Sequence, residues 1–187
     1  MNMLREMLME NPIIAAIRDN KELEKVFKSK ASIVFVLYGD ILTIPKICQR
    51  LKENKKTVFI HVDLIEGLRG DSAGIKYVKE YVKPDGIIST KTSNIKYGNA
   101  LGMYTIQRIF VIDSLSLKTG IKNILDIKPN AVEVMPGVAS KIISFLNKEV
   151  RTDIIAGGLI KNKKDVMDSL AAGAIAISTT EQELWEL

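Results

Sequence analysis

The chain has 187 residues, of which 47% are hydrophobic, enough to bury one substantial core. Lys and Arg number 27 and Asp and Glu number 22, so the net charge of +5 permits a polyanionic partner without requiring one. The single cysteine excludes an intrachain disulfide and a cysteine-rich metal site. The sequence lacks both the run of roughly 20 apolar residues that a membrane helix needs and the apolar core of a secretory signal. We therefore expect a cytoplasmic protein with no membrane partner.

Short apolar runs rich in β-branched residues recur along the whole chain. Each has the length and nearly continuous hydrophobicity of a strand that is buried on both faces. The eight runs span 12–17, 33–38, 57–63, 86–89, 105–112, 131–135, 153–156 and 174–178. Their starts lie about 20 to 30 residues apart, which is the length that a strand, a crossover helix and two short loops consume.

The segments between these runs show the periodicity of amphipathic helices, and the first two have apolar residues on one side and lysines on the other. Pro45 falls in the first turn of the second segment, where proline is tolerated, and Gly173 follows the seventh as a stop signal. The expected helices span 21–30, 41–52, 71–82, 92–101, 114–127, 138–147, 162–172 and 180–187.

Strict alternation of strand and helix predicts a parallel sheet with right-handed crossovers. Eight units favour an α/β fold of the small TIM-type (β/α)8 barrel class over a flavodoxin-like sheet, which would leave three runs unexplained. No linker divides the chain, so we expect residues 1–187 to form a single domain. At its start, Met1, Leu4 and Leu8 form one stripe. This stripe predicts a short helix over 1–9 that either covers the barrel floor or forms an oligomer contact.

Ligands of such barrels bind where the strands end, and the last two runs end in residues suited to an anion. Gly157 and Gly158 follow the seventh run, and Ser178 and Thr179 follow the apolar part of the eighth. Glycines let a ligand approach backbone N–H groups, and the N–H groups at a helix start favour a phosphate. We therefore predict a phosphate site here, against the alternative of a tight turn and a simple helix cap. No Walker or GxGxxG motif indicates a nucleoside triphosphate.

A histidine and a carboxylate lie two residues apart at the end of the third run, so strand alternation places them on the same face. His61 and Asp63 could form a metal pair or an acid–base pair. The chain has no further histidine, which weakens both ideas. We expect Asp63 to bond ligand hydroxyls, His61 to be a satisfied buried group, and no metal to be bound.

Three charged residues belong to the neighbouring fourth, fifth and sixth units. A charge inside a buried strand is unfavourable unless it is paired, so Glu133 should pair with Lys91 or with Arg108. Lys91 could instead contact a phosphate, or supply the amine of a Schiff base as in some barrel aldolases.

Most lysines belong to the outer helices, which is typical of a solvated face. Aromatic residues make up only 6% of the chain, and none alternates with basic residues as a base-stacking platform would. Any contact with a nucleic acid is therefore expected to depend on phosphate attraction and shape.

Several blocks at the predicted strand ends match a known family in the same order along the chain. They read PIIAAIRD (12–19), LYGDI (37–41), VFIHVDLIEGL (58–68), DGIISTK (85–91), TIQRIFVIDS (105–114), EVMPG (133–137), IAGGLI (155–160) and AIST (176–179). Together they resemble the bacterial glycerol-3-phosphate-responsive antiterminator family, the glycerol uptake operon antiterminator regulatory proteins, from about residue 12 to residue 185.

The resemblance implies a small TIM-type barrel that senses glycerol 3-phosphate as an effector, with no other cofactor. It also implies binding to the leader mRNA of glycerol-uptake genes, which prevents early termination. We infer that Gly157, Gly158, Ser178, Thr179 and Lys91 hold the phosphate. The glycerol moiety would then bind Asp63, Glu66 and Asp113. Residues expected to support the ligand contacts from behind are Asp19, Asp40, His61, Arg108 and Glu133.

Two other interpretations stay open from the sequence. The chain could be a barrel enzyme of the isomerase or aldolase type, in which Asp63, Lys91 and Asp113 act on a small phosphorylated metabolite. It could also be a sensor of another small phosphate that acts through protein partners. The sequence leaves open whether the chain forms a homo-oligomer.

Overall fold

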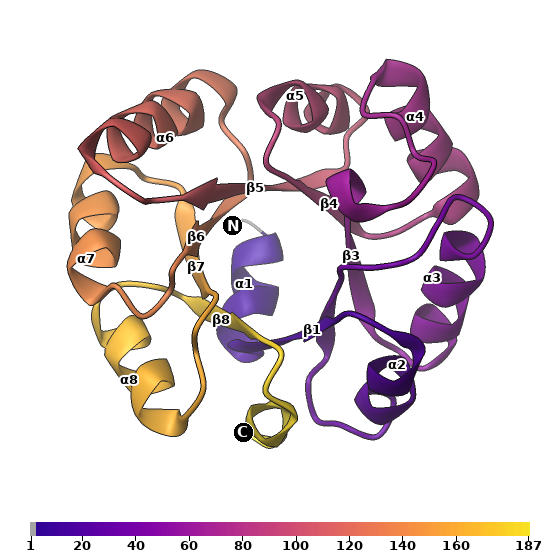
Figure 1. Ribbon diagram of the computed structural model, residues 1–187, viewed down its shortest axis with the longest axis horizontal. Coiled ribbons are helices and arrows are strands. Elements are labelled where there is room, and N and C mark those ends of the chain that lie inside the picture. The colour runs from indigo at the N-terminus through magenta and orange to yellow at the C-terminus, as the bar shows by residue number, and fades with distance from the viewer. Residues whose placement is uncertain (1–2) are drawn as a thin grey trace.

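Eight parallel strands form a closed barrel in the computed structural model, which describes residues 3–187 (Figure 1). The strands pair in chain order, and β8 returns to pair with β1. They are β1 Ile13–Ile17, β2 Ile33–Val36, β3 Thr57–His61, β4 Gly86–Ser89, β5 Tyr104–Phe110, β6 Ala131–Met135, β7 Asp153–Gly157 and β8 Ala176–Thr179. The predicted TIM-type (β/α)8 barrel is therefore confirmed, and a flavodoxin-like sheet is excluded.

Helices surround the barrel in Figure 1 and connect each strand to the next. They are α2 Asn20–Val26, α3 Ile44–Glu53, α4 Ser72–Tyr77, α5 Thr92–Ala100, α6 Ser114–Ile127, α7 Ser140–Glu149 and α8 Lys163–Ala171. Shorter helical turns are the 3₁₀ turns η1 Val62–Leu64 and η3 Gln182–Glu186 and the π-helical turn η2 Val78–Val82, which extends α4. Within residues 3–187, none of these elements has the length and hydrophobicity to cross a membrane.

The strands alternate between two apolar clusters, as buried strands with a two-residue side-chain period must. One cluster joins outward-facing residues such as Ile17 and Val36 to the inner faces of the helices. The other fills the barrel interior, where Phe35 and Phe59 make an edge-to-face contact with ring centroids 5.7 Å apart. The interior is therefore a packed core, and only its two ends can receive other groups.

An additional helix, α1 Met3–Glu10, closes one end of the barrel. Figure 1 shows it within the ring of strands, and Leu4 and Leu8 are fully buried in the interior cluster. Arg5 pairs with Asp153 at the start of β7, so α1 covers the amino-terminal end of the strands. This confirms that the expected N-terminal helix covers the barrel floor, while Met1 of the predicted stripe lies outside the described residues.

Replacing Leu8 with alanine is expected to lower the free energy of unfolding by about 2–5 kcal/mol, because it opens a cavity in the interior cluster. The neighbouring residue Met9 is 57% exposed, so Met9→Ala should change the same quantity by less than about 0.5 kcal/mol. Urea unfolding followed by circular dichroism measures both. Equal effects of the two substitutions would show that α1 does not close the barrel.

Six of the eight strands differ from the expected runs by one or more residues at an end, and β3 and β8 show two local causes. The third run was expected to extend through residue 63, but β3 ends at His61 because residues 62–64 form the 3₁₀ turn η1. The eighth was expected over 174–178, but β8 covers Ala176–Thr179. There the N–H of Ala174 still donates to the carbonyl of Ser169 in the preceding helix, which delays the start of the strand.

Helix starts and ends also shift for local reasons. The helix expected from residue 41 begins at Ile44, because the Asp40 carboxylate accepts hydrogen bonds from the N–H groups of Leu42 and Thr43 and holds a turn there. Pro45 lies in the first turn of α3, as expected. The helix expected over 71–82 divides into α4 and the π-helical η2.

Candidate ligand-binding site

A pocket of about 340 Å³ opens at the end of the barrel opposite α1, where the strands end. Residues at the ends of β1, β5 and β6 line one part of it, and the loops after β7 and β8 line the other. The pocket, called the mouth pocket below, is lined among others by Arg18, Arg108, Met135, Gly158, Ser178 and Thr179. Three residues of the predicted phosphate site therefore come together in one cavity.

The backbone around β7 and β8 offers hydrogen-bond donors to this cavity. Gly158 has φ +77° and Leu159 has φ +61°, so two consecutive residues adopt the left-handed conformation directly after β7. The N–H groups of Gly158, Leu159 and Thr180 donate to no other residue between 3 and 187. The Ser178 hydroxyl likewise has no hydrogen-bond partner within residues 3–187. Residues that line a pocket and have unpaired N–H groups are suited to binding an anion.

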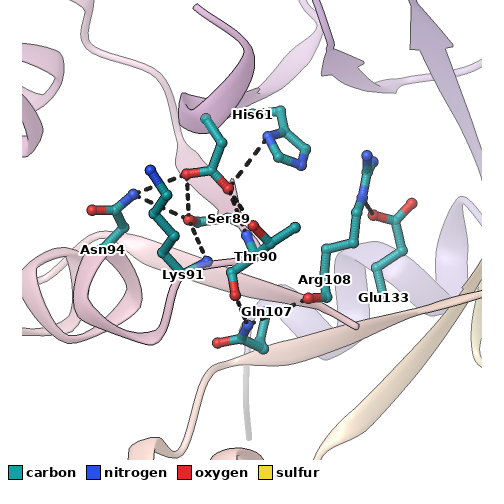
Figure 2. Close-up of polar contacts among 9 residues, drawn as sticks. His61, Ser89, Thr90, Lys91, Asn94, Gln107, Arg108 and Glu133 are labelled. Carbon is teal, nitrogen blue, oxygen red and sulfur yellow. Dashed lines mark hydrogen bonds and ion pairs between the residues drawn. The ribbon is translucent and has the colours of Figure 1, made fainter. Parts of the chain in front are cut away.

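A buried ion pair lies in the wall of the mouth pocket. Arg108 is 6% exposed, and its Nε donates to Oε2 of the fully buried Glu133 at 2.6 Å. Arg108 and Glu133 are register partners on β5 and β6, and Figure 2 shows their side chains next to each other. Arg108 Nη2 and Glu133 Oε1 are buried without a hydrogen-bond partner. The ion pair predicted for Glu133 is thus formed with Arg108, and Nη2 of the guanidinium has no acceptor within residues 3–187.

Gly157 contributes to the site by its lack of a side chain. A Cβ atom at this position would lie 2.5 Å from Glu133 Oε1, so the glycine leaves the space that the buried carboxylate occupies. Gly157 is buried and is not among the residues that line the mouth pocket. Its role in this structure is to accommodate Glu133.

A second cation lies at the rim of the mouth pocket. The Arg18 guanidinium donates to Glu22 at 3.0 Å, and this hydrogen bond and the charge of Glu22 raise the pKa of Arg18. The Arg18 side chain is largely exposed, whereas Glu22 is buried. Arg18 belongs to the polar residues that follow the predicted strands, but the sequence assigned it no ligand contact, although it lies two residues after the inward-facing Ala16.

Asp63 is the acceptor of a separate network that joins β3 to the loop after β4. Its Oδ1 accepts from Ser89 Oγ at 2.8 Å and from Asn94 Nδ2 at 3.0 Å, and its Oδ2 accepts from the N–H and hydroxyl of Thr90. Figure 2 shows Ser89, Thr90 and Asn94 gathered at this point, apart from the Arg108–Glu133 pair. Burial raises the pKa of Asp63, but these hydrogen bonds outweigh it and hold the pKa below its ordinary value.

His61 is almost fully buried beside this network. Its Nδ1 lies 4.0 Å from Asp63 Oδ2 and has no hydrogen-bond partner. His61 is thus buried as expected, but the expectation that its polar atoms are satisfied is wrong for Nδ1. Burial and the positive charge of Arg108 lower the pKa of His61 to about 4, so the ring is neutral at pH 7. In residues 3–187, no group of three or more His, Cys, Asp or Glu side chains could hold a metal ion.

Replacing Asp63 with asparagine is expected to lower the free energy of unfolding by about 2–4 kcal/mol at pH 7, because one oxygen acceptor becomes an NH₂ donor facing other donors. Since folding lowers the pKa of Asp63, its contribution is complete above the unfolded pKa of about 4 and is lost as the pH falls through the folded value. The difference between wild type and variant should therefore shrink below pH 4.

Urea unfolding between pH 3 and pH 7 checks this prediction. Asp126→Asn is the control, because Asp126 is exposed on α6 and its side chain makes no hydrogen bond or ion pair within residues 3–187. A pH-independent difference for Asp63→Asn would contradict the account of the network.

The other predicted carboxylates and Lys91 lie outside the lining of the mouth pocket. Asp19 and Asp113 accept hydrogen bonds as N-caps of α2 and α6. Glu66 is exposed and bonds through its backbone to Gly39 and Ile41, beside Asp40. Lys91 is an exposed residue at the start of α5. Their contacts with a ligand remain predictions.

The family to which the chain belongs follows from a match to a family model. The model of the family described as "Glycerol-3-phosphate responsive antiterminator" matches residues 13–185. The chain belongs to this family. The resemblance inferred from the sequence is therefore confirmed, and membership supports a regulatory role.

Individual members of the family and related proteins match over nearly their whole length. The uncharacterized protein YgcP of Escherichia coli (strain K12) is 38% identical over 184 residues, which cover 98% of this chain and 96% of YgcP. The crystal structure of the glycerol uptake operon antiterminator regulatory protein from Listeria monocytogenes has a TM-score of 0.91 at 31% identity and covers 93% of this chain and 94% of that one. A glycerol uptake operon antiterminator-related protein from Thermotoga maritima has a TM-score of 0.85 at 32% identity, covering 95% and 99%. Aldolases and other enzymes with similar structures are less than 25% identical and show the fold alone.

Proposed function

We propose that this chain senses glycerol 3-phosphate in the mouth pocket and, in the ligand-bound state, binds the leader mRNA of glycerol-uptake genes and prevents early termination. Family membership supports the regulatory class. The observation that carries the ligand assignment is the mouth pocket itself, which is lined by Arg108 and by residues whose backbone N–H groups have no partner in the described chain.

The phosphoryl group fits this arrangement by charge and by hydrogen bonding. In the proposed complex it accepts hydrogen bonds from the N–H groups of Gly158 and Thr180 and from the Ser178 hydroxyl. Arg108 supplies a buried positive charge whose Nη2 has no partner in the described chain. A charge-assisted hydrogen bond in a buried site is stronger than one at the surface, so Arg108 should contribute most to affinity.

The mouth pocket is lined by other residues that can bind the glycerol hydroxyls than the carboxylates expected from the sequence. Asp63 already accepts four hydrogen bonds, and Glu66 and Asp113 do not line the pocket. Glu181 and Thr180 do line it, and both can bond a hydroxyl group. We therefore assign the glycerol hydroxyls to Glu181 and Thr180.

The enzyme alternative gains no support from these residues. Lys91, proposed as the amine of a Schiff base, does not line the mouth pocket. His61 is buried and neutral at pH 7, and Asp63 is fully engaged in the network. The proposal is a non-catalytic sensor in which ligand binding favours the state that binds RNA, since a ligand shifts only an equilibrium whose states it distinguishes.

Titration calorimetry and thermal unfolding with glycerol 3-phosphate, glycerol and inorganic phosphate test the sensor. Glycerol 3-phosphate at 100 times its Kd should stabilise the protein by about 2.7 kcal/mol, and glycerol at the same concentration should not. Unfolding that is indifferent to glycerol 3-phosphate would contradict the proposal.

A gel-shift titration with the leader transcript tests the RNA step. At fixed salt concentration, glycerol 3-phosphate should lower the Kd of the transcript, because salt alone changes such affinities strongly. Ligand binding without RNA binding would contradict this step and favour a sensor that acts through a protein partner.

A further inference from the structure

A basic groove on the outside of the barrel has no role in the mouth pocket. It lies between α3 and η2, which contact each other, and has a volume of about 630 Å³. The turn η2 extends α4, the outer helix next to α3 in Figure 1. One side is formed by α3 and the turn before it, and the other by the end of η2. The residues used below to define this α3–η2 groove are Leu42, Lys46, Gln49, Lys52, Tyr81 and Lys83.

The groove carries an excess of positive charge. Lys46, Lys52 and Lys83 are exposed in it, while Glu53 is the one acidic residue that lines it, and Glu53 accepts a hydrogen bond from Gln49. Lys52 pairs with Asp85 at 3.2 Å. The ammonium groups of Lys46 and Lys83 have no partner in residues 3–187, so two cations remain available to an anionic ligand.

An aromatic side chain is presented beside these cations in a fixed position. Tyr81 is 67% exposed and stacks on Tyr77, with ring centroids 5.4 Å apart and an interplanar angle of 21°. Tyr77 is held in turn by its hydroxyl, which donates to the carbonyl of Ile41 at 2.9 Å, and it packs against the core. The ring of Tyr81 is therefore supported from one side and open on the other.

The π-helical turn η2 explains this placement. It ends at the buried Val82, directly after the exposed Tyr81, and the next residue, Lys83, has φ +56°. Wide helical turns of this kind are often found at functional sites. Here the turn brings an aromatic face and two unpaired lysines together, although the sequence separates Lys46 from Tyr81 by 35 positions.

We propose that the α3–η2 groove is the surface on which this chain binds single-stranded RNA, with a base stacked on Tyr81 and neighbouring phosphates bound by Lys46 and Lys83. A positively charged groove with a stacking aromatic residue is the combination that single-stranded nucleic acids require. The inference rests on the proposed RNA-binding function and specifies its location. The groove lies on the outside of the barrel, so RNA and glycerol 3-phosphate bind at separate sites.

Fluorescence anisotropy with the labelled leader transcript, at saturating glycerol 3-phosphate, tests the location. Tyr81→Ala should raise the Kd about 5- to 150-fold, and Tyr81→Phe, which keeps the ring, should stay within about 3-fold of wild type. The double variant Lys46→Gln/Lys83→Gln should lower the slope of log K against log salt by about 1.4, as expected for two lost phosphate contacts to a single strand.

A matched control removes the same groups elsewhere. Lys118, Lys122 and Phe145 line a groove between α6 and α7 and are exposed, so Lys118→Gln/Lys122→Gln/Phe145→Ala should leave RNA affinity and salt slope unchanged. Calorimetry with glycerol 3-phosphate should give the wild-type Kd for every groove variant, which shows that the fold and the mouth pocket are intact.

The outcomes separate the two proposals. If wild type binds the transcript and the Tyr81 and lysine variants behave like the control, RNA binds elsewhere and only the groove assignment fails. An equal loss in Tyr81→Ala and Tyr81→Phe would also overturn it, because stacking needs only the ring. If wild type binds no RNA with ligand present, both the groove and the RNA-binding function are wrong.

Discussion

Replacing Arg108 with methionine is expected to abolish binding of glycerol 3-phosphate and to lower the free energy of unfolding by about 3–5 kcal/mol. Arg108 is the buried cation in the lining of the mouth pocket, so its removal leaves the phosphoryl group without its main charge partner. The loss of stability has a different origin. Glu133 is fully buried, and without Arg108 its charge has no partner.

A second substitution separates these two effects. Arg108→Met/Glu133→Leu removes both charges of this pair, and replacing a buried ion pair by apolar residues of similar volume is often neutral or stabilising. The double variant should therefore unfold at about the same urea concentration as wild type while still failing to bind the ligand. Calorimetry and urea unfolding of the two variants check the prediction. Ligand binding by the stable double variant would show that Arg108 does not hold the phosphate.

Replacing Gly158 with aspartate is expected to weaken binding of glycerol 3-phosphate at least about 100-fold. The Gly158 N–H is one of the unpaired donors of the mouth pocket, so the new carboxylate would lie close to the bound phosphate. Repulsion between like charges about 4 Å apart amounts to about 4 kcal/mol per pair in a partly buried site. Calorimetry at constant ionic strength measures the change in Kd.

Gly158→Asn is the matched control for this charge effect. Both side chains tolerate the φ of +77° at this position better than other residues do. The nearest atom to an added Cβ would be Met135 Cγ at 3.5 Å, an ordinary contact. The asparagine variant should lose less than about 10-fold in affinity. Equal losses of affinity in Gly158→Asp and Gly158→Asn would mean that the size of the new side chain, and not its charge, weakens ligand binding.

The barrel could be predicted from the sequence because its strands are buried on both faces. A run such as 33–38 is apolar throughout, and the helices between the runs show one apolar face each. The ends of the elements were harder to predict, since they depend on local hydrogen bonds such as those accepted by Asp40. The helix over the barrel floor followed from one short stripe that includes Leu4 and Leu8.

The phosphate end of the site was partly predictable for a similar reason. Gly158 directly follows β7, and Ser178 and Thr179 are the last two residues of β8, so chain order alone brings them to the same end of the barrel. The pairing of Glu133 could be narrowed to two candidates, but only the register of β5 and β6 identifies Arg108 as its partner.

Roles that depend on distant contacts could not be predicted. Asp63 was expected to bind ligand hydroxyls, but it accepts hydrogen bonds from Ser89 and Asn94 instead. These partners are 26 and 31 positions away in the sequence, so no local sequence pattern predicts them. The stacking platform of the α3–η2 groove was missed in the same way. Tyr81 and Lys46 belong to different helices. The sequence was searched only for aromatic residues that alternate with basic residues within one segment, so this pair was not found.

Amide chemical shifts test the central claim most directly, which is that the mouth pocket binds the phosphoryl group of glycerol 3-phosphate through backbone N–H groups and Arg108. When the ligand is added to ¹⁵N-labelled protein, the largest shifts should occur at the amides of Gly158, Leu159 and Thr180 and at Nε–H of Arg108. These shifts should follow one saturation curve with the calorimetric Kd. Unchanged resonances at these four groups in the presence of saturating ligand would contradict the account.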